Sequence, residues 1–303
     1  MSASRFRDLS AVNAGFRPRI SLLGEWDFTE VSTAVLGSLA FGRALIDSCG
    51  VRRTDSHEKM VLYMLQRFLS VADAERALRV FGKLARHDIG RWALTGGIAV
   101  EIHLLRLGRQ PSIRVLNDLD FIADSFDCIP ETLTADFVFR HIHSLDPPGK
   151  TMLQFIDPDN ATRIDVFRAY GATMSRAFRL DLPSGAIRVI SLEDLVARTA
   201  RLTLDIAEGV AVPSKHASDF LRLTELVDPS QVEIAWQDHR KPKHPATFAE
   251  SNNLLQHLIL TRPQLLITPH YSHDTKKLCP RCEPTAAFRL ADPNLIIALL
   301  GYC

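Results

Sequence analysis

The sequence lacks several features that would assign a class of protein at once. Its 303 residues carry 36 basic and 35 acidic side chains, so the formal net charge is only +1. A general attraction of the whole surface to nucleic acid is therefore not implied, and any basic binding face must be local. No apolar run approaches the ~20 residues that a membrane-spanning helix needs. We therefore expect no membrane partner.

Targeting and disulfide patterns are missing as well. Residues 1–20 contain arginines throughout and no apolar segment, which is not the pattern of a signal peptide. The five cysteines are an odd number, and only Cys279 and Cys282 lie close together, so they do not form a disulfide framework. These absences favour a cytoplasmic protein.

The composition is that of a globular protein with enough apolar material for a sizeable core. Hydrophobic residues make up 46% and charged residues 23% of the chain. Apolar residues recur at helical spacing over 32–48 and 57–87, whereas residues 1–30 show no clear period. Gly90 ends this pattern. The first third of the chain is therefore predicted to be mainly helical.

Beyond Gly90 the pattern changes to short strands. A strand over 92–95 ends at Gly96 and Gly97, and a helix is predicted over 98–107. Further strands are predicted at 118–123, 137–143, 152–156, 163–168 and 186–190.

Helices return in the last third of the chain. Ser191 with Asp194 three residues later resembles a capping box, which predicts a helix to about residue 206. Two more helices are predicted at 215–226 and 245–260. The order of elements indicates an α+β fold, in which a mixed or mostly antiparallel sheet is surrounded by helices.

Two aspartates lie on one of the predicted strands. Residues i and i+2 of a strand point to the same face, so Asp118 and Asp120 present two carboxylates side by side. Two like charges so close are costly unless a cation lies between them, and Mg²⁺ suits paired oxygen ligands. An Asp-x-Asp pair alone is a weak signal, because 157–159 is a second copy that is explained as a solvated turn.

Three further features strengthen the metal hypothesis. Gly96 and Gly97 join a strand to a helix, where free backbone N–H groups can meet phosphate. Asp165 lies on a later strand and could complete a metal site and accept a proton from an attacking hydroxyl. Lys215 at the start of a later helix can meet phosphate charge, and Asp219 can orient it. Each also has a structural explanation: a tight turn, an exposed acid or a surface ion pair.

Taken together, these residues resemble the AbiEii-type nucleotidyltransferases, a family of the polymerase-beta superfamily. The resemblance covers roughly 91–226. Its motifs occur in this order: Leu94-Thr95-Gly96-Gly97, Arg114, Asp118-Leu119-Asp120, Arg163-Ile164-Asp165, Ser191-Leu192-Glu193-Asp194-Leu195, and Lys215-His216 with Asp219.

The resemblance implies a fold, an activity and roles for these residues. Gly96 and Gly97 would hold the triphosphate of a nucleoside triphosphate, and Asp118 and Asp120 would bind Mg²⁺ or Mn²⁺. Asp165 would join the metal site and activate the acceptor hydroxyl. The lysine motif, Lys215 with Asp219, would contact the nucleotide phosphates. Many members are toxins that transfer a nucleotide to an RNA end such as that of tRNA, and they are paired with a cognate antitoxin.

The chain departs from the family pattern at several positions. Ile98 stands where a small hydroxyl residue usually follows the glycines, and Leu116 stands where a serine is common. The stretch between Gly97 and Asp118 is longer than usual, so the loop around Pro111 is an elaboration. These differences leave the metal site intact but remove possible phosphate contacts.

Two other classes of enzyme also use an Asp-x-Asp pair. A phosphatase of the haloacid dehalogenase type would have Thr or Val soon after the second acid, but Phe121 follows. A glycosyltransferase would have a nucleotide-binding βαβ unit upstream, where helices are predicted. A catalytically inactive protein that binds a nucleotide or a partner on the same scaffold stays an open alternative.

The order of the predicted elements, together with the resemblance over 91–226, divides the chain into four parts. We predict an N-terminal helical segment (1–90), a nucleotidyltransferase-like core (91–190), a helical domain (191–265) and a tail (266–303) that is a small zinc knuckle.

The tail carries the Cys279-Pro280-Arg281-Cys282 turn, whose two-residue gap lets both thiolates bind one ion. His270 and His273 lie just upstream and could complete four ligands. Cys303, His257 or a partner chain are alternative ligands, and two free thiols in a turn are the structural explanation.

We predict that the purified protein holds about one zinc ion per chain, because the metal would pin a tail that has no core of its own. Elemental analysis measures the zinc content. A metal-free preparation that keeps its full thermal stability would contradict the prediction.

Overall fold

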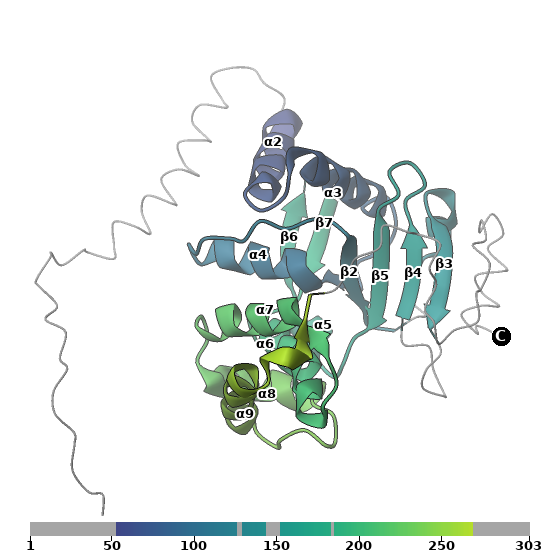
Figure 1. The fold of residues 1–303 in the computed structure, drawn as a ribbon. Helices are drawn as coiled ribbons and strands as arrows, with labels where there is room; N and C mark the ends of the chain where they lie inside the picture. Colours follow the sequence, from purple (N-terminus) through teal and green to yellow (C-terminus); the bar gives the residue numbers. More distant parts are fainter. Residues whose placement is uncertain (1–52, 126–128, 144–151, 183–184, 269–303) are drawn as a thin grey trace, which may run out of the picture. The chain divides into compact units, whose positions relative to one another are not determined.

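A computed structural model describes the chain over residues 53–125, 129–143, 152–182 and 185–268 (Figure 1). These residues all belong to one unit of the chain, which begins at Arg52. The predictions for 1–30 and 32–48 and the zinc ligands His270, His273, Cys279 and Cys282 lie outside the described residues. None of the helices described is long and apolar enough to cross a bilayer.

The described residues form a seven-stranded mixed sheet in the order β3-β4-β5-β2-β1-β7-β6 (Figure 1). The neighbours β1 and β7 run parallel, as do β2 and β5, and the remaining neighbours are antiparallel. The strands are β1 (Trp92–Leu94), β2 (Asp118–Ala123), β3 (Val138–His143), β4 (Met152–Ile156), β5 (Arg163–Arg168), β6 (Phe178–Leu182) and β7 (Gly185–Val189).

An aromatic core covers one face of the sheet. The ring of Phe121 on β2 lies 6.5 Å from that of Phe81 and 5.9 Å from that of Trp92. Phe155 on β4 lies 6.0 Å from Trp92, and all four rings are buried. Large buried rings supply much of the apolar surface that is removed from water. Because side chains alternate along a strand, the neighbours of Phe121 on β2 are directed to the opposite face.

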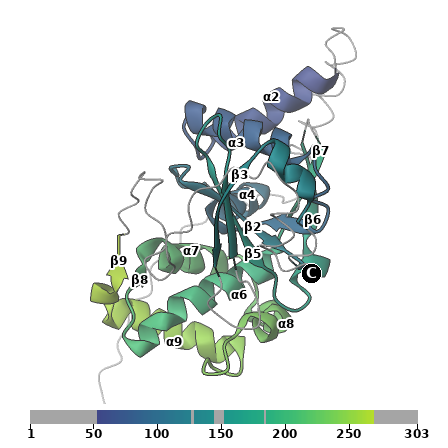
Figure 2. The same cartoon turned by 90° about the vertical axis from the view of Figure 1, so that its right-hand side faces the viewer.

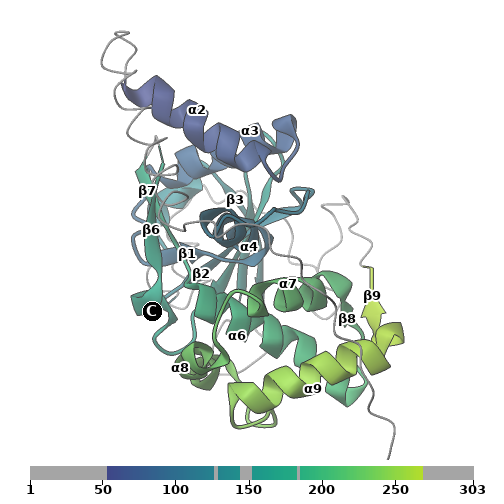
Figure 3. The same ribbon diagram turned by 90° about the vertical axis from the view of Figure 1, so that its left-hand side faces the viewer.

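Helices cover the sheet and gather beyond one of its ends. Figures 2 and 3 show α6, α7, α8 and α9 together at this end, with α2 and α3 at the other. The helices are α2 (Arg53–Gln66), α3 (Val71–Leu84), α4 (Gly96–Arg106), α5 (Thr173–Arg176), α6 (Leu192–Thr203), α7 (Ser214–Thr224), α8 (Pro229–His239) and α9 (Phe248–Thr261). Short 3-10 helices are η2 (Glu131–Ala135), η3 (Leu204–Glu208) and η4 (Pro263–Leu265), and a separate small sheet pairs β8 (Val212–Pro213) with β9 (Leu266–Ile267).

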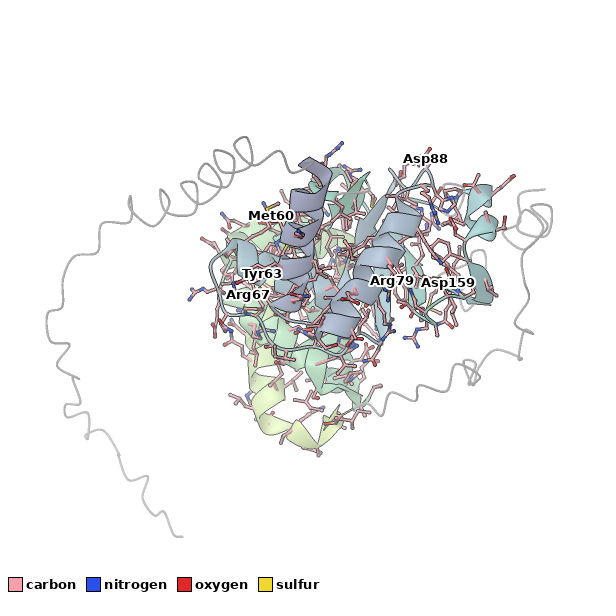
Figure 4. All side chains as sticks on the ribbon, turned by 90° about the horizontal axis from the view of Figure 1, so that it is seen from above. Met60, Tyr63, Arg67, Arg79, Asp88 and Asp159 are labelled. Atoms are coloured by element: carbon pink, nitrogen blue, oxygen red, sulfur yellow. The ribbon has the colours of Figure 1, made fainter. Side chains whose placement is uncertain are left out.

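The helices α2 and α3 are amphipathic and lie side by side, with an outer surface that is visible in Figure 4. Ser70 caps α3 by accepting a hydrogen bond from the backbone of Asp73. On the outer surface Met60 is 50% and Tyr63 is 65% exposed. The helical spacing predicted over 57–87 corresponds to these two helices, and the chain turns between them at residues 67–70.

The second Asp-x-Asp pair is part of a turn, as predicted, but only Asp159 is solvated, with 74% of its side chain exposed. Asp157 is fully buried, and its carboxylate accepts hydrogen bonds from the side chains of Lys83 and Asn160. Lys83 also pairs with Asp159. The pair therefore joins the β4–β5 turn to α3.

A buried carboxylate, Asp194, joins the sheet to the helices at its end. Arg176 donates to both of its oxygens, with Nε–Oδ2 and Nη2–Oδ1 distances of 2.8 and 2.7 Å. Ser191 and His239 also contact it. Burial acts to raise the pKa of Asp194, but the hydrogen bonds from Arg176 and His239 outweigh it and hold this pKa well below its usual range. The contact with Ser191 is half of the predicted capping box, because Ser191 accepts from the Asp194 backbone.

Most predicted elements are confirmed, within a few residues at their ends. The mixed α+β sheet, the five strands beyond Gly97 and the helices after Ser191 are present. The larger elements that were missed are β6, an edge strand with alternating charged and apolar residues, and α8, which Asp228 caps through the backbone of Ser230. Both had sequence signals, a period of two and an Asp-Pro helix start.

Replacing Asp194 by Ala is expected to lower the free energy of unfolding by about 3 kcal/mol, because Arg176 would lose its buried partner. In the wild type the contribution of Asp194 is present above the usual aspartate pKa and is lost as the pH falls through its depressed folded-state pKa. Chemical denaturation at pH 7 measures the loss, and a series from pH 5 to pH 2 follows the decrease of the contribution in the wild type.

The matched control is Asp181→Ala, whose pair with Arg179 is exposed, at 65% and 73%. It is expected to change stability little. Equal losses in the two variants would contradict the role of Asp194 as a buried junction.

Candidate active site

The strand directions bring three aspartates together. Because β2 runs antiparallel to β1, Leu94 at the end of β1 pairs with Phe121, and Asp118 and Asp120 lie beyond that end. The parallel pairing of β2 with β5 places Asp120 directly opposite Asp165. Carboxylate oxygens of Asp118, Asp120 and Asp165 all lie within 4.8 Å of one another. We call these three residues the acidic cluster.

Gly96 lies against the acidic cluster and has a backbone that favours glycine. Its φ is +68°, in the left-handed region, and a Cβ placed there would lie 2.0 Å from Oδ2 of Asp120. The backbone N–H of Thr95 donates to the carbonyl of Asp120 at 2.8 Å, which holds the turn against β2. The β1–α4 turn and the acidic cluster are therefore in direct contact.

Burial and mutual repulsion make the acidic cluster hard to ionise fully. Burial, together with the charges of Asp118 and Asp165, raises the pKa of Asp120 to about 7. Burial also raises the pKa of Asp165 to about 6, although the positive charge of Arg163 acts in the opposite direction. A cation bound between the three carboxylates would stabilise their ionised form.

A pocket of about 250 Å³ opens beside the acidic cluster. The turn at Gly96 and Gly97 and the helices α6 and α7 all contribute to its lining. Its lining is mixed, with an apolar part from Val100, Phe167, Leu195 and Leu202 and a polar part from Asp118, Asp120, Arg198, Thr199, Lys215, His216 and Asp219.

Two cationic side chains face the acidic cluster within this pocket, Arg198 from α6 and Lys215 from α7. We call them the cationic wall. The guanidinium carbon of Arg198 lies 4.9 Å from the ring centre of Phe167, which orients it over β5. Burial and the neighbouring charge of Lys215 lower the pKa of His216 to about 4, so this imidazole is neutral at pH 7.

A buried ion network fixes the helices that frame the pocket. Glu101 of α4 is fully buried and binds Arg114 and Arg222. Arg114 also pairs with Asp219 of α7 and passes beside Gly97. Asp219 was predicted to orient Lys215, and the structure places its carboxylate on Arg114. The network therefore ties the start of α4 to α7.

The structure brings the residues predicted at the nucleotide site to one place. Gly96, Gly97, Lys215 and Asp219 line the pocket, and the acidic cluster adjoins it. Sequence reasoning gave no role to three further residues there: Arg163, Arg198 and His216. Arg163 could have been found from its position two residues before Asp165, on the same strand face. Arg198 has no local signal, because its role depends on how α6 packs.

Comparisons with known proteins leave the family unassigned. No family model matches the chain, and no curated protein matches it. Among solved structures it is similar to the antibiotic-resistance factor ANT(2'')-Ia, with 12% identity, a TM-score of 0.33 and coverage of 68% of this chain and 100% of that chain. It is similar to an antigenic nucleotidyltransferase-like protein from Paracoccidioides brasiliensis, with 16% identity, a TM-score of 0.33 and coverage of 65% and 92%.

The Megavirus polyadenylate synthase is a third such structure, with 10% identity, a TM-score of 0.31 and coverage of 70% of this chain and 40% of that chain. At these identities and TM-scores the likeness assigns neither a family nor an activity. The AbiEii-type resemblance stays a prediction, and the chemistry of the site has to be inferred from its own residues.

Gly96→Ala is expected to displace the carboxylate of Asp120 and to weaken Mn²⁺ binding, because its Cβ would overlap Oδ2. Gly108→Ala is the matched control: its φ is +66°, and no atom lies within 4 Å of the added Cβ. Both variants carry left-handed backbone strain of about 1–2 kcal/mol. Thermal unfolding and Mn²⁺ calorimetry separate the two effects. Equal Mn²⁺ affinities in the two variants would contradict the contact with Asp120.

Proposed function

We propose that the chain is a metal-dependent nucleotidyltransferase, which moves a nucleoside monophosphate from a nucleoside triphosphate to an acceptor hydroxyl. The observation that carries this proposal is the acidic cluster beside a glycine turn, with the cationic wall across the same pocket. A metal-bound polyphosphate has both charges that this arrangement needs, a cation for the carboxylates and anionic oxygens for Arg198 and Lys215.

The donor set fits Mg²⁺ or Mn²⁺. Hard divalent ions prefer carboxylate oxygens, and they take their remaining ligands from water and substrate phosphates. Asp118, Asp120 and Asp165 would hold the ion. When bound, the ion would act as a Lewis acid that neutralises phosphate charge.

The chain's own residues would position the triphosphate. Gly96 and Gly97 begin α4, and a helix N-terminus carries unpaired N–H groups and a partial positive charge that favour phosphate. Arg198 and Lys215, which line the same pocket, add two positive charges. The apolar part of the lining, with the ring of Phe167, would accommodate the nucleoside.

In the proposed reaction an acceptor hydroxyl oxygen attacks the α-phosphorus. The new O–P bond forms as the bond from the α-phosphorus to the bridging oxygen breaks, and pyrophosphate leaves with that electron pair. The carboxylate of Asp165 would accept the hydroxyl proton. Positioned aspartate carboxylates serve as general bases of this kind in enzymes.

The acceptor and the biological role are narrower proposals that rest on the AbiEii-type resemblance. An RNA end, such as that of tRNA, or a protein hydroxyl would be the acceptor. A role as the toxin of a toxin–antitoxin pair would add a cognate antitoxin as partner. The alternative, an inactive nucleotide-binding protein, predicts NTP binding without transfer.

Incubation with each labelled NTP, Mg²⁺ and total RNA or protein is expected to label an acceptor, and EDTA should abolish the label. Asp165→Asn keeps the shape but removes the proton acceptor, so transfer should fall by at least about 100-fold. Asp181→Asn, on the exposed edge strand β6, is the matched control and should transfer normally. Metal-dependent NTP binding without any transfer would favour the inactive alternative, and no binding at all would exclude both.

A further inference from the structure

Arg163 occupies the strand position nearest to Asp118. It begins β5, and the parallel register with β2 pairs its Cα with that of Asp118. Because Arg163 and Asp165 are two residues apart, their side chains share one face of the sheet. The side chain of Arg163 is therefore directed at the acidic cluster by the sheet itself.

The guanidinium of Arg163 contacts two of the three carboxylates. Its Nη2 donates to Oδ2 of Asp118, and its Nε lies 3.3 Å from Oδ1 of Asp165. Gln154 donates to the same Oδ1 of Asp165 at 2.9 Å. Both contacts of Arg163 are made with carboxylates that a divalent ion would need as ligands.

The hold of Arg163 on the acidic cluster is incomplete. Its Nε is buried and forms no hydrogen bond among the described residues, so its approach to Asp165 is an ion pair without hydrogen-bond alignment. The side chain is 35% exposed, which leaves it room to move toward solvent. A charge held this way can be exchanged for another without unfolding the sheet.

We propose that Arg163 is an internal counter-cation, which occupies Asp118 and Asp165 in the protein without metal and is released when a divalent ion binds. The inference rests on the proposed function and adds a regulation of the same site. Ion and arginine compete for the same carboxylates, so the measured metal affinity is the intrinsic affinity multiplied by the fraction of molecules in which Asp118 is free. Arg163 thereby holds Asp118 and Asp165 together in the metal-free protein and sets the metal concentration at which the site fills.

Mn²⁺ calorimetry on three forms of the full chain tests the proposal. Arg163→Met should bind Mn²⁺ about tenfold more tightly than the wild type, as expected if the arginine holds Asp118 in about nine-tenths of the metal-free molecules. Arg163→Lys keeps the charge but loses the planar fork that reaches both carboxylates, so its affinity should lie between the two. Weaker binding by Arg163→Met, or wild-type affinity in Arg163→Lys, would overturn the proposal.

A second measurement tests the role of Arg163 without an activity assay. In metal-free buffer Arg163→Met should unfold at a lower temperature than the wild type, because the carboxylates lose their counter-cation. Saturating Mn²⁺ should then raise its unfolding temperature by more than it raises that of the wild type. An equal rise in both proteins would contradict the competition.

The control and the wild type keep this inference separate from the proposed function. Arg91→Met removes the same charge from an exposed pair with Asp124, which follows the other end of β2. The Mn²⁺ affinity of Arg91→Met should equal that of the wild type. A tenfold gain in this control would mean that the effect of Arg163→Met comes from the change in net charge, and it would overturn the proposal. A wild type that binds no Mn²⁺ would defeat the proposed function, whereas normal wild-type binding without a gain in Arg163→Met would defeat only this inference.

Discussion

The pairing of β2 with β5 is the constraint on which the rest of the site depends. Asp118 and Asp120 are neighbours on one strand, but Asp165 reaches them only because the two strands run parallel in a register that sets Asp120 opposite it. A shift by one residue would direct Asp165 into the aromatic core instead. The buried residues Leu119, Phe121 and Val166 make that shift costly, so the core enforces the geometry of the polar face.

Groups of opposite charge come from different elements of the site. The acidic cluster lies on the sheet, the cationic wall comes from two helices beyond its end, and Arg163 lies within the cluster itself. Each group is half-buried or buried, where charges are screened less than at the surface. The pocket can thus accept a ligand that carries both signs of charge, which agrees with a nucleotide and its metal.

Sequence reasoning found the strands and the three aspartates because their signals are local. Short alternating segments mark β2 and β5, and a pair of glycines marks the turn before α4. Arg198 and the Glu101 network were not predictable in this way, since they depend on which faces of α4, α6 and α7 meet. The position of Arg163 on Asp118 depends on strand register, which a single sequence does not specify. Local patterns therefore predicted the three candidate metal ligands. Their surroundings depend on the packing of distant segments.

The helix α6 has a consequence for how mutations in this protein are interpreted. Asp194, the junction with Arg176, and Arg198, part of the cationic wall, lie one helical turn apart on it. Damage to the junction would shift the guanidinium that faces the acidic cluster, even in a chain that still folds. Loss of activity in such a variant would then come from the displaced charge of Arg198. The same helix therefore supports both the fold and the proposed site.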